Sequence, residues 1–185
     1  MLVGAGAAVW LAAALGGFWL WERYDATPGP QGGSAAATAQ AATGGWRLTL
    51  FAHPHCPCTR TSLREMTEIP RDAPALSVRV VFVRPAGAPE EWERGDSWEA
   101  AGRMPGAEVA RDVDGTEAKR LGAKTSGLAV LSDPGGRIVF RGGLTSGRGR
   151  GGDSVGRRAV LSWLRTGRGD PTAPVFGCPL FTPDD

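Results

Sequence analysis

Cysteine and histidine are scarce in this chain, and neither sign of charge is in large excess. Its 185 residues include three cysteines and two histidines, and 21 basic against 19 acidic side chains give a formal net charge of +2. Three cysteines are too few for a disulfide-stapled scaffold and exclude a four-cysteine zinc site. The near balance of charge gives no basis for binding nucleic acid. The length suits one ordinary domain with additional segments.

Charge is missing altogether from the beginning of the chain. Residues 2–21 carry no charged side chain, and a helix of that length, rising ~1.5 Å per residue, reaches ~30 Å, the thickness of the bilayer hydrocarbon core. The aromatic cluster at residues 18–24 is typical of the interfacial end of a span. A cleaved signal peptide is the alternative, because residues 35–37 resemble a cleavage site, but signal cores are shorter. We expect residues 1–24 to form a retained transmembrane anchor.

The rest of the chain divides by composition. Residues 25–45 are rich in Ala, Gly, Pro, Ser and Thr, which bury too little apolar surface to offset their ordering entropy, so we expect a flexible linker. From residue 46 onward, apolar residues alternate or recur at helical spacing, and we assign residues 46–166 to one folded domain. Residues 167–185 form a C-terminal tail with a single cysteine, Cys178.

Hydrophobic periodicity within the domain predicts an alternation of strands and helices that ends in a hairpin. The hairpin turn is Asp133–Gly136. Strands are expected at residues 47–51, 76–83, 108–112, 127–131 and 137–140, and helices at 59–69, 115–121 and 155–164. Asp112, Asp114 and Gly115 resemble the start of a calcium loop, but the remaining ligand positions are not supplied, so we favour a strand end and a helix cap.

Both histidines and two of the three cysteines fall within residues 53–58, whose sequence is HPHCPC. Proline is favoured at the first helical position, and the residue before a proline is pushed out of helical geometry, so Cys56 is expected to cap a helix. Unpaired amides and partial positive charge at a helix N-terminus lower the pKa of a thiol. We therefore predict that Cys56 is an exposed, acidic nucleophile, with His53 and His55 stabilising its thiolate or relaying its proton.

Two cysteines are candidates for the second thiol of a redox pair. Cys58 lies close enough to attack a mixed disulfide at Cys56, although a bridge across one residue is strained and strained disulfides are labile. Cys178 is the other candidate if the tail folds back, and a lone surface or structural thiol is its alternative. The predicted catalytic residues are therefore Cys56, Cys58, His55 and Cys178.

The same cluster also fits a metal. His53, His55, Cys56 and Cys58 supply two imidazoles and two soft sulfurs, which suit copper(I). A copper-binding protein or metallochaperone is therefore the alternative function, with copper as its ligand. A stabilising disulfide flanked by loop histidines is a third, structural interpretation.

Several motifs together resemble thioredoxin-like proteins tethered to bacterial membranes. They are FAHPHCPC at residues 51–58, RDVDG at 111–115, TSG at 125–127 and the hairpin of 133–143, and the tract at 142–145 is similar to proteins labelled RedB. The similarity covers about residues 46–165. It implies an α/β, three-layer thioredoxin-like fold with a mixed central sheet, located outside the cytoplasm, whose partners are protein thiols or disulfides.

Two positions depart from the pattern of that family. Thr59 stands where the second motif cysteine is usual, and Gly127 stands where a cis-proline usually faces the thiol and presents the substrate backbone. From the residues of the cluster, our leading hypothesis is a membrane-tethered thiol-disulfide oxidoreductase without a cofactor. The two departures leave open a non-catalytic thioredoxin-like domain that its anchor localises to the membrane.

Overall fold

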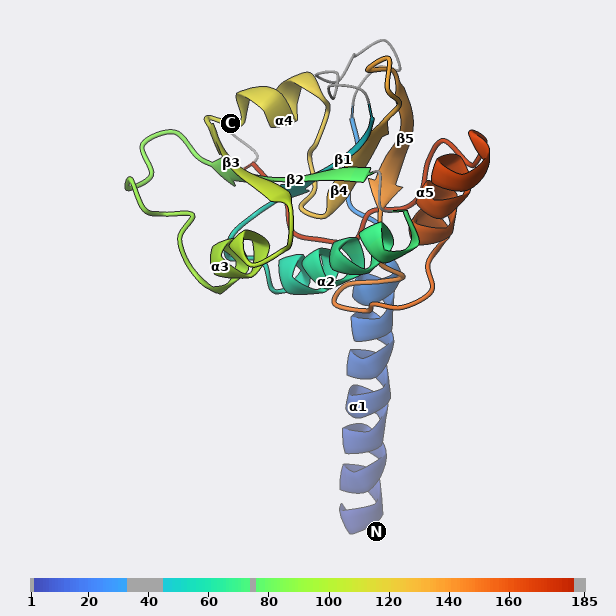
Figure 1. Ribbon diagram of the computed structural model, residues 1–185. Helices are drawn as coiled ribbons and strands as arrows, with labels where there is room; N and C mark the ends of the chain where they lie inside the picture. The colour runs from blue at the N-terminus through green and yellow to red at the C-terminus, as the bar shows by residue number, and fades with distance from the viewer. Residues whose placement is uncertain (1, 33–44, 74–75, 182–185) are drawn as a thin grey trace.

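The computed structural model describes residues 2–32, 45–73 and 76–181. A long helix, α1 (Leu2–Ala26), stands away from a folded domain that contains every strand of the described chain (Figure 1). The strands are β1 (Trp46–Ala52), β2 (Leu76–Arg84), β3 (Ala107–Val113), β4 (Leu128–Ser132) and β5 (Ile138–Gly143). The remaining helices are α2 (Pro57–Asp72), α3 (Asp96–Gly102), α4 (Thr116–Arg120) and α5 (Val155–Thr166).

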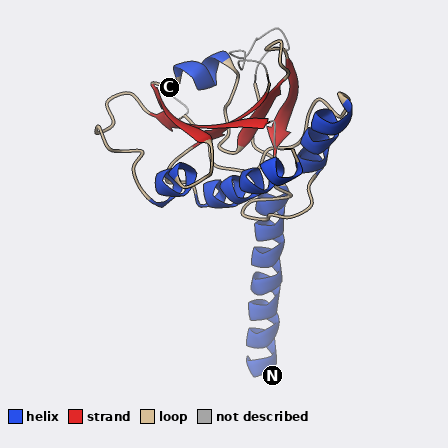
Figure 2. Cartoon of the chain, in the orientation of Figure 1, coloured by secondary structure: helices blue, strands red, loops and turns tan. Residues whose placement is uncertain are grey.

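The strands form one mixed sheet with β1 at its centre. The strand order is β3-β2-β1-β4-β5, and β1 runs parallel to β2 and antiparallel to β4. Leu50 of β1 lies opposite Val80 on one side and Ala129 on the other. Helices and strands alternate until the β4–β5 hairpin. Figure 2 shows helices on both sides of the sheet. This is the expected thioredoxin-like arrangement, and the predicted fold class is confirmed.

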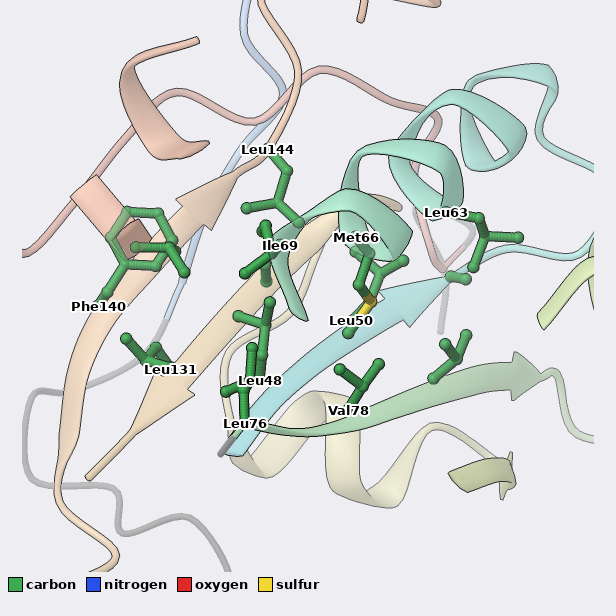
Figure 3. Close-up of a cluster of buried hydrophobic side chains, with 14 of the residues drawn as sticks. Leu48, Leu50, Leu63, Met66, Ile69, Leu76, Val78, Leu131, Phe140 and Leu144 are labelled. Carbon is green, nitrogen blue, oxygen red and sulfur yellow. The ribbon is translucent and has the colours of Figure 1, made fainter. Parts of the chain in front are cut away.

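Two apolar clusters lie between the sheet and the helices on its two faces. The resulting three layers can be followed in Figure 1. The larger cluster lies under α2, α3 and α5. Figure 3 shows Leu63, Met66 and Ile69 of α2 directed at side chains of the sheet such as Leu50. The smaller cluster joins the other face to Ala118 of α4 and also contains Val175 and Leu180 from the tail. The helical spacing of the α2 residues therefore predicted its buried face correctly.

The helix that follows β3 begins at a carboxylate cap. Asp112 accepts hydrogen bonds from the backbone amides of Glu117 at 3.0 Å and Ala118 at 2.8 Å, and its side chain is buried. Both carboxylate oxygens are thereby occupied by unpaired amides of the first turn. The cap interpretation of this motif is confirmed.

Helix α1 is apolar on all sides as far as Trp21, and this part of it is not covered by the domain. Trp10 is 71% exposed, and Leu15 and Leu20 are more than half exposed. Among the described residues, Gly4–Ala26 is the single helical segment long and apolar enough to cross a membrane. The apolar surface of this helix is therefore not buried in the core of the domain.

The segment after α1 lies against the domain. Gly29 donates its amide hydrogen to the carbonyl of Val175 at 2.8 Å, and the Thr125 hydroxyl donates to the carbonyl of Pro30 at 2.7 Å. The amide of Gly32 donates to Gly122 at 3.0 Å. The first residues of the expected linker are thus packed on the domain, whereas residues 33–44 lie outside the described chain.

Candidate active site

Cys56 lies at the junction between the central strand and α2. It is the N-cap of α2 with φ −80° and ψ 122°, and Pro57 takes the first helical position, as the sequence predicted. Its amide donates to the carbonyl of His53 at 3.1 Å, which closes the turn that leads out of β1. The sequence pattern thus places a sulfur where helix amides converge.

The predicted exposure of Cys56 is wrong. The residue is 2% exposed, yet it belongs to neither apolar cluster of the core. Its Sγ lies 2.8 Å from the Sγ of Cys178, in hydrogen-bond contact. The C-terminal tail contributes to this burial. The contact joins residues far apart in sequence, so hydrophobic periodicity could not predict it.

The tail reaches the site by running back along the edge of the sheet. Beyond α5, Arg141 of β5 donates its amide hydrogen to Pro171 at 2.9 Å and accepts from Ala173 at 3.2 Å. The amide of Gly143 donates to Pro174 at 3.1 Å. These bonds direct the chain toward the end of β5 and from there across to Cys56.

The end of the tail pairs with the loop before β4. The amide of Ser126 donates to the carbonyl of Cys178 at 2.8 Å, and the amide of Leu180 donates to the carbonyl of Lys124 at 2.9 Å. Thr125 and Pro179 form an antiparallel bridge between these two bonds. The tail is therefore bridged to this loop at one residue pair and presents Cys178 to Cys56.

The two facing thiols have opposite pKa shifts. Burial raises the pKa of Cys56, but hydrogen bonds from the side chain and amide of Cys178, and further ones from Cys58, outweigh burial and leave that pKa below its ordinary value. Burial and the contact with Cys56 raise the pKa of Cys178 to about 12. Of the two thiols, Cys56 is therefore the one that loses its proton first as the pH rises.

Cys58 is the third thiol of the site. It is half-buried in the first turn of α2, and burial together with the charge of the Cys56 thiolate raises its pKa. The nearby Arg148 guanidinium and the amide of Gly149 act in the opposite direction without reversing the shift. All three cysteines are free thiols. The Sγ atom of Cys178 lies 2.8 Å from that of Cys56.

The histidines form an aromatic group with Trp92 beside the thiols. The ring centroids of His53 and His55 lie 5.1 Å and 4.8 Å from that of Trp92, both edge-to-face. Burial, and secondarily the charge of His55, lower the pKa of His53, so its ring is neutral at pH 7. His53 Nδ1 accepts a hydrogen bond from the His55 amide at 3.2 Å.

The predicted copper ligands do not converge. Across residues 2–32, 45–73 and 76–181, no three His, Cys, Asp or Glu side chains are placed to hold one metal ion. His53 and His55 are instead in contact with Trp92, and Cys56 with Cys178. A copper site formed by His53, His55, Cys56 and Cys58 would need a rearrangement of this loop.

Thr59 has a structural role at the position of the missing motif cysteine. It is 1% exposed, and its hydroxyl donates to the carbonyl of His53 at 2.9 Å and lies 3.1 Å from the Ser126 hydroxyl. Ser126 Oγ in turn accepts from the His53 amide at 2.9 Å. This network fixes the Cys56 turn to the loop that carries the tail.

Gly127 follows that loop at the position where a cis-proline was expected from the family pattern. Its φ is +94°, in the region that favours glycine, and its amide donates to Phe51 at 2.8 Å. The described residues contain no cis peptide bond. The tail is hydrogen-bonded to the residue before Gly127, because the amide of Ser126 donates to the carbonyl of Cys178.

A cavity of about 250 Å³ opens beside the nucleophile. Its lining includes His55, Cys56 and the oppositely charged Arg60 and Asp96, whose charged atoms are 3.9 Å apart. The cavity is polar and suits water or a small hydrophilic group better than an apolar ligand.

Sequence reasoning missed four residues of the site: Trp92, Ser126, Arg148 and Gly177. Cys178 itself was among the predicted residues. Its neighbours Gly177 and Pro179 were the one local sign that the backbone around it is irregular. Nothing local marks Arg148, because eight arginines lie between residues 137 and 168.

Comparison with known proteins shows the fold. No family model and no curated protein sequence matches the chain. A hypothetical protein from Sinorhizobium meliloti 1021 is similar over 86% of this chain and 98% of its own, with 20% identity and a TM-score of 0.61. An uncharacterized conserved protein from Geobacillus kaustophilus is similar over 83% of this chain and 93% of its own, with 20% identity and a TM-score of 0.60.

A weaker similarity links the chain to an exposed lipoprotein thioredoxin from Streptococcus pneumoniae strain TIGR4. It covers 66% of this chain and 85% of that protein, with 17% identity and a TM-score of 0.48. By its sheet topology and layers, this chain has a thioredoxin-like fold. In this chain the C-terminal tail brings Cys178 to the N-cap of α2.

Proposed function

We propose that this protein is a membrane-tethered, extracytoplasmic thiol-disulfide oxidoreductase in which Cys56 is the nucleophile and Cys178 the resolving thiol. The observation that carries the proposal is the 2.8 Å contact between their sulfurs, with the pKa of Cys56 lowered and that of Cys178 raised. A thiolate is the attacking species in thiol-disulfide exchange, so this pair has a defined order of reaction.

In the reducing direction, the Cys56 thiolate attacks one sulfur of a partner disulfide, and the other partner sulfur leaves as a thiolate. The Cys178 thiolate, formed once its proton has passed to that leaving sulfur, then attacks Cys56 Sγ. This step releases the second partner sulfur and leaves a Cys56–Cys178 disulfide, so two electrons have moved to the partner. A dithiol reductant restores the pair by the reverse exchange.

Cys178 is a better resolving thiol than Cys58 for a geometric reason. A bridge between Cys56 and Cys58 would span a single intervening residue and would be strained. Cys178 approaches from the C-terminal tail, and its Sγ already lies 2.8 Å from the Sγ of Cys56. Cys58 then remains a spare thiol whose raised pKa keeps it protonated.

The anchor and the location outside the cytoplasm are supported by the uncovered apolar helix and by the family resemblance of residues 46–165. The narrower resemblance to RedB proteins rests on sequence residues alone. Protease added to spheroplasts that express the full chain is expected to digest the domain while a cytoplasmic marker stays intact. Protection of the domain would overturn the proposed location.

The redox assignment is tested by three matched variants of the full chain, each mixed with a disulfide-bonded model protein. Cys178→Ala is expected to accumulate a mixed disulfide at Cys56, Cys58→Ala to turn over without accumulation, and Cys56→Ala to be inactive. Accumulation in Cys58→Ala instead would reassign the resolving thiol. Loss of all reactivity in the unmodified protein, with copper bound after purification, would favour the copper alternative.

A further inference from the structure

The tail segment that holds Cys178 occupies the place where a partner's cysteine must lie. Cys56 is 2% exposed, and the tail supplies the sulfur in contact with it. The backbone next to that contact is engaged as well, because the amide of Ser126 is bound to Cys178 and the carbonyl of Lys124 to Leu180. A partner strand can present a sulfur in this geometry only after the tail has left.

We propose that the tail is a built-in replica of the substrate: partners are extended protein segments with glycine immediately before the reactive cysteine and an apolar residue two positions after it, and they bind by displacing residues 175–181. This inference rests on the proposed thiol-disulfide function and names its substrate class.

Glycine before the cysteine is required by close approach of two backbones. A Cβ built on Gly177 would lie 1.9 Å from the carbonyl oxygen of Ser126 and 2.9 Å from its carbonyl carbon. No side chain can relieve such a contact, because both atoms belong to the backbone of the loop. Any segment that pairs with Ser126 as the tail does must therefore also have glycine there.

The apolar position is defined by Leu180. Its side chain is 2% exposed and lies in the smaller core cluster with Phe51 and Leu121. A charged residue at this position would bury its charge without a partner among these apolar side chains. In contrast, Pro179 between the two positions is exposed, so that site accepts many residues.

The tail is held differently on the two sides of Pro174. Upstream, Pro171, Ala173 and Pro174 are hydrogen-bonded to β5. Downstream, each backbone bond of the tail is made to a loop or to the segment after α1, as with Val175 and Gly29. Displacement of residues 175–181 therefore leaves the sheet and its edge pairing intact.

The test uses the full chain with Cys58→Ala and Cys178→Ser, so that Cys56 is the one thiol while the tail backbone is retained. The probes are the peptides VFGCPLF, VFACPLF and VFGCPDF, each with its cysteine joined to 5-thio-2-nitrobenzoate in a mixed disulfide. Attack of the Cys56 thiolate on the peptide sulfur forms the peptide adduct and releases the coloured aromatic thiolate. Release is followed by absorbance and the adduct by mass spectrometry.

VFGCPLF is expected to react roughly tenfold faster than either altered peptide. Adding Gly177→Ala to the protein is expected to increase the rate with VFGCPLF severalfold, because the tail then competes poorly for Ser126. Gly102→Ala is the matched control, since a Cβ there meets nothing within 4 Å, and it should leave the rate unchanged.

Equal rates for the three peptides would overturn the inference while leaving the redox function standing, because Cys56 would still have reacted. An unchanged rate in Gly177→Ala would overturn the displacement step. Failure of Cys56 to react with any of the probes would instead contradict the proposed function itself. The peptide comparison requires no change of Gly177, so it remains decisive if that variant does not fold.

Discussion

Arg148 Nη1 donates a hydrogen bond to the carbonyl oxygen of Gly177, the residue before Cys178. The same guanidinium donates from Nε to the carbonyl of Tyr24 at 3.3 Å and lies 4.5 Å from the centroid of the Tyr24 ring. One side chain thus joins the end of α1 to the tail segment that carries Cys178. The loop after β5 thereby connects α1 to the pair of facing thiols.

The positive charge of Arg148 lowers the pKa of Cys58 against the stronger effect of burial. In a Cys56→Ala, Cys178→Ala background, Arg148→Met is therefore expected to raise the pKa of Cys58, whereas Arg148→Lys, which keeps the charge, should change it less. The pH dependence of alkylation, quantified by mass spectrometry, gives the pKa, and the plateau rate at high pH reports accessibility separately. Identical pKa values in the two variants would contradict this role of Arg148.

Cys178 lowers the pKa of Cys56 through hydrogen bonds from both its side chain and its amide. Cys178→Ala removes the side-chain donor and should raise the pKa of Cys56. As the pH falls, thiolate reactivity should therefore be lost at a higher pH in this variant than in the unmodified protein. Cys178→Ser retains a donor and is expected to show a smaller rise. The measurement is thiolate absorbance against pH in a Cys58→Ala background. A pKa that stays constant across the series would show that the Cys178 side chain does not lower it.

Local patterns were sufficient for most of the fold. Alternation marked β1, helical spacing marked the buried face of α2, and the turn at Asp133–Gly136 marked the β4–β5 hairpin. These features depend on residues close in sequence, so one chain carries the signal. Even the cap of α2 was predictable, because Pro57 constrains the residue before it.

The site was less predictable because its second half comes from elsewhere in the chain. Cys56 and Cys178 are 122 positions apart, and a tail with little periodicity does not reveal where it folds. The predicted exposure of Cys56 was wrong for that reason, whereas the role of Cys58 stays a prediction. Arg148 was equally hidden, since its role depends on where the loop after β5 meets the tail.

The carboxylate of Asp112 should stabilise the domain by capping α4. Asp112→Ala leaves the amides of Glu117 and Ala118 without their acceptor and is expected to lower the free energy of unfolding by about 1–2 kcal/mol. Asp170→Ala is the control, because that side chain is exposed and should contribute less than about 0.5 kcal/mol. Denaturant titration in detergent measures both. If added calcium restored stability to the unmodified protein after chelation, the cap assignment would be incomplete.

His53 should make stability depend on pH in mildly acidic solution. Burial, followed by the charge of His55, lowers the pKa of His53 from its ordinary 6.5, so the folded state binds fewer protons than the unfolded state in this range. Stability from the neutral ring is therefore fully present above pH 6.5 and is lost as the pH falls from 6.5 toward the lowered pKa of the folded state. His53→Gln should flatten this slope, because glutamine does not titrate.

His55→Gln is the informative companion variant. It removes one of the two causes of the shift and leaves burial, so the slope below pH 6.5 should become shallower without disappearing. Free energies of unfolding at several values between about pH 5 and pH 7 distinguish the three proteins. A slope in His53→Gln as steep as in the unmodified chain would mean that another group titrates there. The aromatic contact with Trp92 would then be a packing feature with no link to proton binding.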